Sequence, residues 1–456
     1  MQYSTEEIEY KVTRKHSIMS EFHVTGGTPL HGSVRIGGAK NASYKLMIAS
    51  LLADTESRLL NFSRISDVQL VAKIIDYLGG KTTRAGERAI FIDPTQLQSF
   101  EIDQAHGEQG RFSTMFIPPL LARFGEARVP APGGDKIGKR PLDRHFDGLR
   151  ALGATVTFEN GMHVARAKKL VGTTYKFSKN SHTGTETMIM AAVKAKGKTI
   201  LENAALEPEI DDLIEYLNEM GARIRRRSYR VIEIEGVSKL HGAIHKLIPD
   251  RNEAVSYACA AIVTKGDVII QNARQDHLTA FLEKLDEIGA GYEIGNYGIR
   301  FFYKGPLRAA DITTEIEPGF MTDWQPLMAT VLTQCEGTSI LHETIMANRF
   351  QYVSELTKMG ANITKFNPEI NHPEKVYNFD LKNDEPDNKH AIKIIGKTNL
   401  TAGEFEVKDL RHGATLILAA MCATGTTVIK GIEHVDRGYE DLDGRLKSMG
   451  AKILRK

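Results

Sequence analysis

One glycine- and proline-rich segment carries an acid well placed to move a proton. Residues 131–143 read Ala-Pro-Gly-Gly-Asp-Lys-Ile-Gly-Lys-Arg-Pro-Leu-Asp, which sets Asp135 close to Lys136, Lys139 and Arg140. The glycine pair permits a sharp backbone bend, so we expect a loop that can close over a ligand. Basic neighbours favour the ionised acid, whereas desolvation on closure favours the protonated acid. Asp135 is therefore a candidate proton donor, although this segment alone is more typical of a solvated charged turn.

Charged and hydroxyl side chains also recur directly before six apolar segments that we expect to be buried helices. They are Lys40 and Asn41, Arg111, Thr183 and Thr185, Asp250 and Arg251, Asp323, and Asp409 with Arg411. The N-terminus of a helix attracts anions through its free N–H groups and its dipole. Ordinary capping explains the aspartates and threonines well, but a base at this end opposes the dipole. We therefore expect bound anions to offset that cost at Lys40, Arg111 and Arg251.

If three such helix ends from each domain face one another, they line an anion-binding cleft, and two further features fit this prediction. A second set of bases follows the strands, at Arg140, Arg349 and Arg437. Asp323 lies in the sequence Thr-Asp-Trp-Gln, which is typical of a helix cap. If it lies among the bases of a cationic cleft, the same acid could take the proton of a hydroxyl group.

A repeated unit positions these residues. The phrase Leu/Met/Ile-Gly-Gly/Ala ends six amphipathic segments, with its glycine at positions 79, 153, 221, 289, 360 and 450. The successive spacings are 74, 68, 68, 71 and 90 residues, a period that suits a supersecondary module. Each glycine is expected in the left-handed conformation that ends a helix.

Each repeat also contains an earlier helix that is apolar on all sides, followed by a glycine and usually a strand. Such helices must be buried, so we predict an α/β (α+β) fold with helices inside sheets and two domains of three units each. The longest spacing contains an insertion, residues 367–388, which is rich in Asn, Asp, Glu, Lys and Pro. We interpret it as a surface excursion without a functional signal.

Composition restricts the class of protein. The chain has 456 residues, a net charge of +2, 25% charged and 41% apolar residues, and three cysteines without metal-site spacing. Neither nucleic acid nor membrane insertion is indicated, and residues 1–21 form a polar leader rather than a signal peptide. A cytoplasmic location follows by default. The sequence lacks a phosphate-loop, dinucleotide or zinc motif, so we expect no cofactor and no metal.

The motifs resemble those of the enolpyruvyl transferase family, most closely the branch that uses UDP-N-acetylglucosamine. They include Gly38-Ala-Lys-Asn-Ala42, Leu121-Ala-Arg-Phe-Gly125, Pro132-Gly-Gly134, Glu207-Pro-Glu-Ile210, Pro249-Asp-Arg251, Asn348-Arg-Phe350, Asp409-Leu-Arg411 and Asp436-Arg-Gly-Tyr-Glu440. The resemblance implies two inside-out α/β barrel domains, each of three βαβαββ-like units, with the active site in the cleft between them. One domain comprises residues 22–39 plus 249–456, and the other comprises residues 40–248 and carries the loop 131–143.

The resemblance also implies the reaction. Enolpyruvyl would pass from phosphoenolpyruvate to the 3′-hydroxyl of UDP-N-acetylglucosamine by addition and elimination, with release of phosphate, as the first committed step of peptidoglycan synthesis. Position by position, Asp135, Asp323, Lys40 and Arg411 match catalytic residues. Substrate contacts match Lys40, Asn41, Arg111, Arg140, Pro141, Leu142, Asp143, Arg144, His145, Lys179, Ser181, His182, Asp323, Ile345, Arg349, Asp409, Arg411 and Arg437.

Among these contacts, Lys40, Arg140 and Arg437 match those to the phosphate of phosphoenolpyruvate, and Arg349 and Arg411 match those near its carboxylate. Contacts to the nucleotide sugar match Arg111, residues 140–144 and residues 179–182. Many cations are needed because a diphosphate, a phosphate and a carboxylate share one closed cleft.

Two departures from the family pattern leave alternatives open. Most of the family has cysteine where this chain has Asp135, and fosfomycin alkylates that cysteine, so we expect this protein to be insensitive. Arg144, His182 and Thr183 also differ on the sugar side. The alternatives are a transferase for another nucleotide sugar, a non-catalytic paralogue, and the sister enzyme that acts on shikimate 3-phosphate, which the 131–143 loop and Asp436-Arg-Gly-Tyr disfavour.

Overall fold

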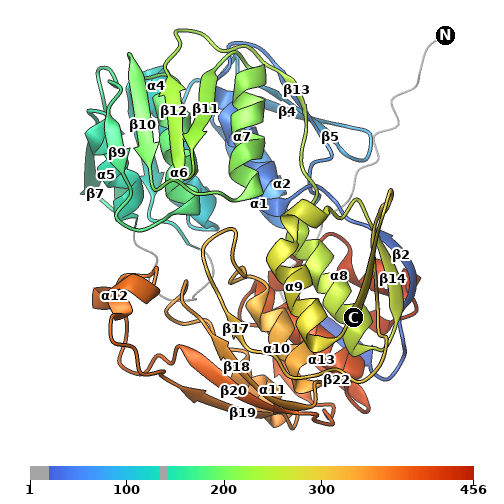
Figure 1. The fold of residues 1–456 in the computed structure, drawn as a ribbon. Helices are drawn as coiled ribbons and strands as arrows, with labels where there is room; N and C mark the ends of the chain where they lie inside the picture. Colours follow the sequence, from blue (N-terminus) through green and yellow to red (C-terminus); the bar gives the residue numbers. More distant parts are fainter. Residues whose placement is uncertain (1–19, 134–141) are drawn as a thin grey trace, which may run out of the picture.

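The computed structural model describes residues 20–133 and 142–456, which form two lobes (Figure 1). One hydrophobic core is built from residues between Ala39 and Leu247, and we call this part the upper lobe after its place in Figure 1. The other core, that of the lower lobe, combines Phe22–Ile36 with residues between Ala254 and Ile453. We propose that these lobes are the two domains expected from the sequence. The leader lies almost entirely outside the described residues.

The upper lobe contains three sheets and their helices. Its elements are α1 (Lys40–Ala49), η1 (Ser50–Leu52), β3 (Ser57–Leu60), α2 (Ser66–Tyr77), β4 (Lys81–Ala85), β5 (Ala89–Asp93), α3 (Gln104–Gly107), η2 (Arg111–Phe116), α4 (Ile117–Phe124), β6 (Glu126–Pro130), α5 (Asp143–Ala151), β7 (Thr155–Glu159), β8 (Met162–Arg166), β9 (Thr174–Lys176), α6 (His182–Ala192), β10 (Lys198–Glu202), α7 (Pro208–Glu219), β11 (Arg223–Ser228), β12 (Val231–Glu235) and β13 (Ile244–Lys246).

The lower lobe repeats this plan and includes the first two strands of the chain. Its elements are β1 (Glu21–Thr25), β2 (His31–Arg35), α8 (Arg251–Val263), β14 (Asp267–Gln271), η3 (Gln275–His277), α9 (Thr279–Ile288), β15 (Gly291–Gly295), β16 (Gly298–Phe302), β17 (Ile312–Thr313), α10 (Gln325–Thr333), β18 (Gly337–His342), α11 (Val353–Lys358), β19 (Asn362–Phe366), α12 (Pro373–Val376), η4 (Leu381–Asn383), β20 (Ala391–Gly396), β21 (Glu404–Glu406), α13 (Leu410–Cys422), β22 (Thr426–Lys430), α14 (Glu433–Asp436), α15 (Leu442–Ser448) and β23 (Lys452–Arg455).

The sheets follow one topology. Five have four strands, in the orders β13-β3-β5-β4, β11-β12-β10-β9, β15-β16-β14-β2, β17-β18-β20-β19 and β21-β22-β1-β23. Each of these joins one parallel edge pair to antiparallel neighbours. The sixth sheet, β6-β8-β7, has three strands, and a parallel bridge between Glu101 and Arg128 marks the place of the fourth. The predicted six-fold repeat and α/β fold class are therefore confirmed, and closure into barrels stays a prediction.

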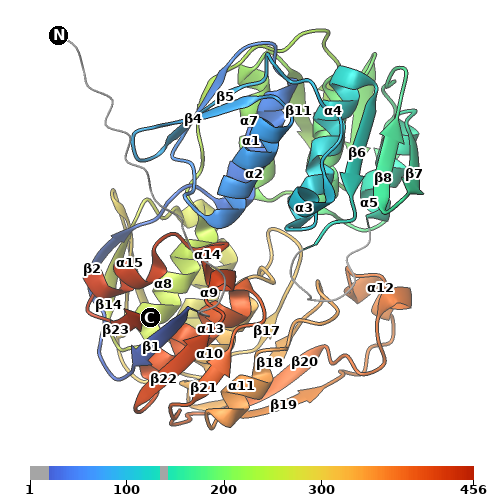
Figure 2. The ribbon, with the colours of Figure 1, turned by 180° about the vertical axis from the view of Figure 1, so that it is seen from behind.

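Helices that are apolar on all sides occupy the interior, as predicted. Every residue of α8 and of α10 is buried, as are the residues of α13 from Leu410 to Met421. These three helices pack against one another in the lower lobe, while strands such as β5 alternate between buried and partly exposed positions. Figures 1 and 2 show the sheets on the outer side of each lobe. The interior helices therefore form the core of each lobe, with the sheets around them.

The repeated glycines adopt the conformation expected of them. Gly79, Gly153, Gly221, Gly289, Gly360 and Gly450 have φ between +80° and +102°. A residue with a Cβ atom is strained in this region, so glycine ends each amphipathic helix at low cost.

The chain crosses between the lobes twice, and the two crossings pair with each other. Gly38 and Pro249 form an antiparallel bridge, and the Ala39 N–H donates to the Ile248 carbonyl at 2.8 Å. A Cβ atom on Gly38 would lie 1.9 Å from the carbonyl oxygen of Asn61, so this close crossing requires glycine. The pairing fixes how the two lobes meet at the start of α1 and of α8.

Candidate active site

A cavity of about 340 Å³ lies where the lobes face each other. Both lobes line it, and many of the lining side chains are charged. The lining contains these residues predicted from the sequence: Lys40, Asn41, Arg111, Arg144, His145, Ser181, His182, Asp323, Ile345, Arg349, Arg411 and Arg437. The described residues Leu142, Asp143, Lys179 and Asp409 lie outside the lining, and Asp135, Arg140 and Pro141 lie outside the described residues.

Asp323 lies between two arginines in the lower lobe. Its Oδ1 accepts from Arg349 Nη2 at 2.9 Å, and its Oδ2 accepts from Arg411 Nη2 at 3.1 Å. Burial disfavours the ionised carboxyl, but Arg411 and Arg349 outweigh burial and hold its pKa well below the usual range. The N-cap position of helix α10 is Trp324, and no side chain caps this helix. The Asp323 carboxylate binds the two arginines instead. A cap, the simpler interpretation of this acid, is wrong.

Arg411 is held by its own helix end. The Asp409 carboxylate accepts from the backbone N–H of Arg411 at 2.9 Å and of His412 at 3.0 Å, which caps α13. Arg411 Nη1 donates to the Tyr439 hydroxyl at 2.8 Å. The guanidinium therefore has a fixed position, and Asp409 acts on the cavity through Arg411 rather than by lining it.

A second carboxylate joins two bases from opposite lobes. Asp67 accepts from Lys40 Nζ at 3.0 Å and from Arg437 Nε at 3.1 Å. Burial raises the pKa of Asp67, but Lys40 and Arg437 outweigh it and lower the pKa overall. The backbone N–H of Lys40 donates to Asp250 Oδ2 at 2.7 Å. An anion that enters the cavity would meet two cations already gathered around one carboxylate.

The prediction that Arg251 binds an external anion is wrong. Arg251 is buried outside the cavity lining and pairs with Glu209 at 3.0 Å and with Glu317 at 2.5 Å. Burial raises the pKa of Glu209, but Arg251 outweighs it and lowers this pKa to about 2. The charge that offsets this base at a helix N-terminus comes from the protein itself.

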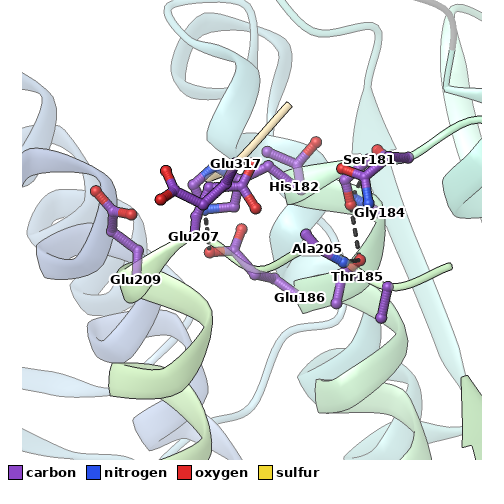
Figure 3. Close-up of polar contacts among 12 residues, drawn as sticks. Ser181, His182, Gly184, Thr185, Glu186, Ala205, Glu207, Glu209 and Glu317 are labelled. Atoms are coloured by element: carbon purple, nitrogen blue, oxygen red, sulfur yellow. Dashed lines mark hydrogen bonds and ion pairs between the residues drawn. The ribbon is translucent and has the colours of Figure 1, made fainter. Parts of the chain in front are cut away.

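The upper-lobe wall contains charges that the motifs did not single out as site residues, beside the predicted residues Ser181 and His182. Lys45 pairs with Glu186 at 2.6 Å, and His182 Nε2 lies 3.1 Å from the same carboxylate. Burial and Lys45 lower the pKa of His182, but Glu186 and Glu207 outweigh them and raise it. Figure 3 shows His182 near Glu207 and Glu317 at the start of α6. Ser181 caps this helix by accepting from the Gly184 N–H at 3.1 Å.

His145 joins α5 to α6 beside the cavity. Its Nδ1 lies 2.8 Å from Thr187 Oγ1, and its Nε2 lies 3.0 Å from Thr183 Oγ1. Burial, Arg111, Arg144 and Lys45 together lower its pKa to about 3. The histidine is therefore neutral when folded and protonates more easily when unfolded.

This difference predicts a pH dependence of stability. Below about pH 6.5 the unfolded state binds the extra proton first, so His145 should subtract about 1.4 kcal/mol from the free energy of unfolding per pH unit down to about pH 3. Urea unfolding at several pH values should therefore show a shallower acid slope in H145Q than in the wild type. Equal slopes in the two proteins would contradict this assignment.

Residues 367–388 were interpreted as a surface excursion without a functional signal. The segment is mostly exposed or half-buried, as expected, but part of it lies at the cavity. Asn378, Phe379 and Asp380 line the cavity. The segment also accepts hydrogen bonds from Arg144 and Lys179 of the upper lobe. Its polar composition concealed this role, because the contacts use mainly backbone carbonyl groups.

Comparison with known proteins places this site in a family. A protein-family model described as EPSP synthase (3-phosphoshikimate 1-carboxyvinyltransferase) matches residues 24–446. The UDP-N-acetylglucosamine 1-carboxyvinyltransferase of Halothermothrix orenii is 40% identical over 437 residues, which cover 96% of this chain and all of the relative. The chain belongs to the UDP-N-acetylglucosamine 1-carboxyvinyltransferases within the EPSP synthase family.

A further relative and two solved structures are also similar to this chain. UDP-N-acetylglucosamine 1-carboxyvinyltransferase 1 of Staphylococcus aureus is 40% identical over 440 residues, covering 96% of this chain and 99% of the relative. The enolpyruvyl transferase NikO from Streptomyces tendae has a TM-score of 0.84 at 22% identity, covering 96% of this chain and 99% of its own. EPSP synthase from Acinetobacter baumannii has a TM-score of 0.71 at 17% identity, covering 96% of this chain and 100% of its own. These two structures establish the enolpyruvyl transferase fold.

Within residues 20–133 and 142–456, no helix is both long enough and apolar enough to span a membrane.

Proposed function

We propose that this protein transfers enolpyruvyl from phosphoenolpyruvate to the 3′-hydroxyl of UDP-N-acetylglucosamine and releases phosphate, the first committed step of peptidoglycan synthesis. The observation that carries this proposal is the half-buried Asp323 carboxylate, held by Arg349 and Arg411 in a cavity shared by both lobes. The close relatives carry the name of this activity. The proposed place of action is the cytoplasm, where phosphoenolpyruvate is made.

The proposed first step is an addition. Asp323 takes the proton of the acceptor hydroxyl, and the hydroxyl oxygen forms a bond to C2 of phosphoenolpyruvate. The methylene carbon C3 receives a proton from Asp135, which gives a methyl group and a tetrahedral C2. In the elimination that follows, the bond from C2 to the phosphate oxygen breaks and its electron pair leaves with the phosphate. C3 returns a proton to the Asp135 carboxylate, which restores the double bond. The products are the enolpyruvyl ether and inorganic phosphate.

The cations of the cavity have separate roles in this proposal. Lys40 and Arg437, now paired through Asp67, hold the phosphate group. Arg349 and Arg411 hold the carboxylate of phosphoenolpyruvate. When that carboxylate binds, it offsets part of the positive charge that now lowers the pKa of Asp323, so this pKa rises and the carboxylate becomes a better base.

The proposal is tested by measuring phosphate release from phosphoenolpyruvate with a set of acceptors. UDP-N-acetylglucosamine should support turnover, and shikimate 3-phosphate should not. Faster turnover with another nucleotide sugar would favour the second candidate function, a transferase for a different acceptor. The observation that favours this candidate is the additional wall formed by Asn378, Phe379 and Asp380. Failure of every acceptor would contradict enzymatic activity.

A further inference from the structure

The inserted segment, residues 367–388, folds as a defined body rather than a loose loop. It connects β19 to β20 and contains α12 and η4. The rings of Tyr377 and Phe379 lie 4.8 Å apart and, together with Ala347, form a small hydrophobic core of their own. The Asn378 N–H donates to the Thr344 carbonyl at 2.8 Å. The segment is thus anchored to the lower lobe beside the cavity. Figure 1 shows α12 at the edge of this lobe that faces the upper lobe.

From this anchor the segment reaches the upper lobe. Lys179 Nζ donates to the carbonyls of Glu374 and, at 2.7 Å, of Tyr377. Arg144 Nη2 donates to the Asn378 carbonyl at 2.8 Å. In the opposite direction, the Asn378 side chain donates to the Asn180 carbonyl at 3.1 Å. These four hydrogen bonds span the two lobes on one side of the cavity.

These contacts change what Arg144 can offer a substrate. Its Nη1 donates to the Asn180 carbonyl at 2.9 Å, and its Nη2 donates to the Asn378 carbonyl. Each terminal nitrogen thus already has an acceptor oxygen, and the Asp380 carboxylate is close enough to interact with the same guanidinium. Arg144 therefore braces Asn180 against the inserted segment, and Asn180 and Ser181 beside it line the cavity.

We propose that residues 367–388 form a clasp, a positioning element that holds the lobes together on the acceptor side and sets the affinity for the nucleotide sugar. This inference rests on the proposed function, because the resemblance assigns Arg144 and residues 179–182 to nucleotide-sugar contacts. Phosphoenolpyruvate is expected to bind at the other cations, Lys40, Arg349, Arg411 and Arg437. Changes in the clasp should therefore alter the affinity for the nucleotide sugar and leave the affinity for phosphoenolpyruvate unchanged.

The first test uses Asn378, whose side chain donates to the Asn180 carbonyl of the upper lobe. N378A removes a hydrogen bond to Asn180 and should raise the KM for UDP-N-acetylglucosamine about three- to tenfold. The kcat and the KM for phosphoenolpyruvate should stay within about twofold of the wild type. The matched control is K382A, in the same segment, whose side chain makes none of the four hydrogen bonds across the lobes. Equal effects of N378A and K382A would overturn the proposal.

A deletion gives a second, independent test. The Asn367 side chain donates to the Asn388 carbonyl at 3.3 Å, so a two-residue Asn-Gly turn can replace residues 368–387. The deletion should raise the KM for UDP-N-acetylglucosamine more than about tenfold, since it removes several such hydrogen bonds. Small-angle scattering of the ligand-free protein should show a larger radius of gyration, because the lobes separate.

The scattering readout keeps the two proposals distinct. If the wild type fails to turn over any acceptor, the proposed function is wrong, and an increased radius of gyration on deletion still supports the clasp. If the wild type is active but neither variant changes the acceptor KM, the clasp is wrong. Thermal unfolding of N378A at the wild-type temperature would show that its effect is not a loss of folding.

Discussion

The substitution D323N should lower kcat by about 10²- to 10⁴-fold, the range that a general base contributes. The amide has nearly the size of the carboxylate but cannot take the hydroxyl proton. It also pairs less strongly with Arg349 and Arg411, which now bind the carboxylate at 2.9 and 3.1 Å. The KM for phosphoenolpyruvate should therefore stay the same or fall, because the arginines are freer to bind its carboxylate.

This pattern separates catalysis from binding. Steady-state kinetics with each substrate in excess gives the two KM values and kcat, and D276N, a surface aspartate of the same lobe paired with Arg274, serves as the control. A rise in the KM for phosphoenolpyruvate with kcat preserved would assign Asp323 to binding. A D323N variant that keeps more than about a tenth of the wild-type kcat would exclude it as the base.

Replacing Asp135 with asparagine should cause a loss of similar size, about 10²- to 10⁴-fold in kcat. Asp135 lies outside the described residues, so this prediction depends on the chemistry and on the family resemblance. Carbon C3 must be protonated for the addition to proceed, and an amide does not supply that proton. D135C provides the matched variant, because cysteine is the usual residue of the family at this position, and it should retain turnover.

Fosfomycin gives the same assignment a second readout. The wild type should resist it, and D135C should be inactivated. The three natural cysteines offer no competing thiolate, since burial raises the pKa of Cys335 and of Cys422 to about 12 and that of Cys259 still further. Inactivation of the wild type, or a D135N variant as fast as the wild type, would contradict the role of Asp135.

The repeat was predictable from sequence because its signals are local. A glycine such as Gly221 directly after an amphipathic segment marks the end of a helix whatever lies elsewhere in the chain. An apolar segment such as residues 257–263 must be buried on all sides, which places it inside the lobe. Strands β1, β2 and β13 pair with strands that are far away in the sequence. No local sequence signal predicts these pairings.

The partners of the charged residues were less predictable. Arg251 was expected to bind an external anion, but its partners Glu209 and Glu317 come from 42 and 66 residues away. Asp67, which lies between Lys40 and Arg437, is in the first turn of a helix and resembles an ordinary acid of that position. Composition described the clasp as a surface excursion, because backbone carbonyl acceptors have no signature in sequence. Ion pairs and carbonyl contacts of this kind depend on the tertiary fold.

The most direct test of the whole account is the reaction run in deuterium oxide with phosphoenolpyruvate and UDP-N-acetylglucosamine, followed by nuclear magnetic resonance of the product. Addition followed by elimination converts the methylene carbon to a methyl group and back, so an acid and a base in the cleft must exchange its protons with solvent. The account predicts an enolpyruvyl ether of UDP-N-acetylglucosamine with deuterium on the vinyl carbon. An ether without deuterium would contradict the mechanism, and the absence of the ether would contradict the function.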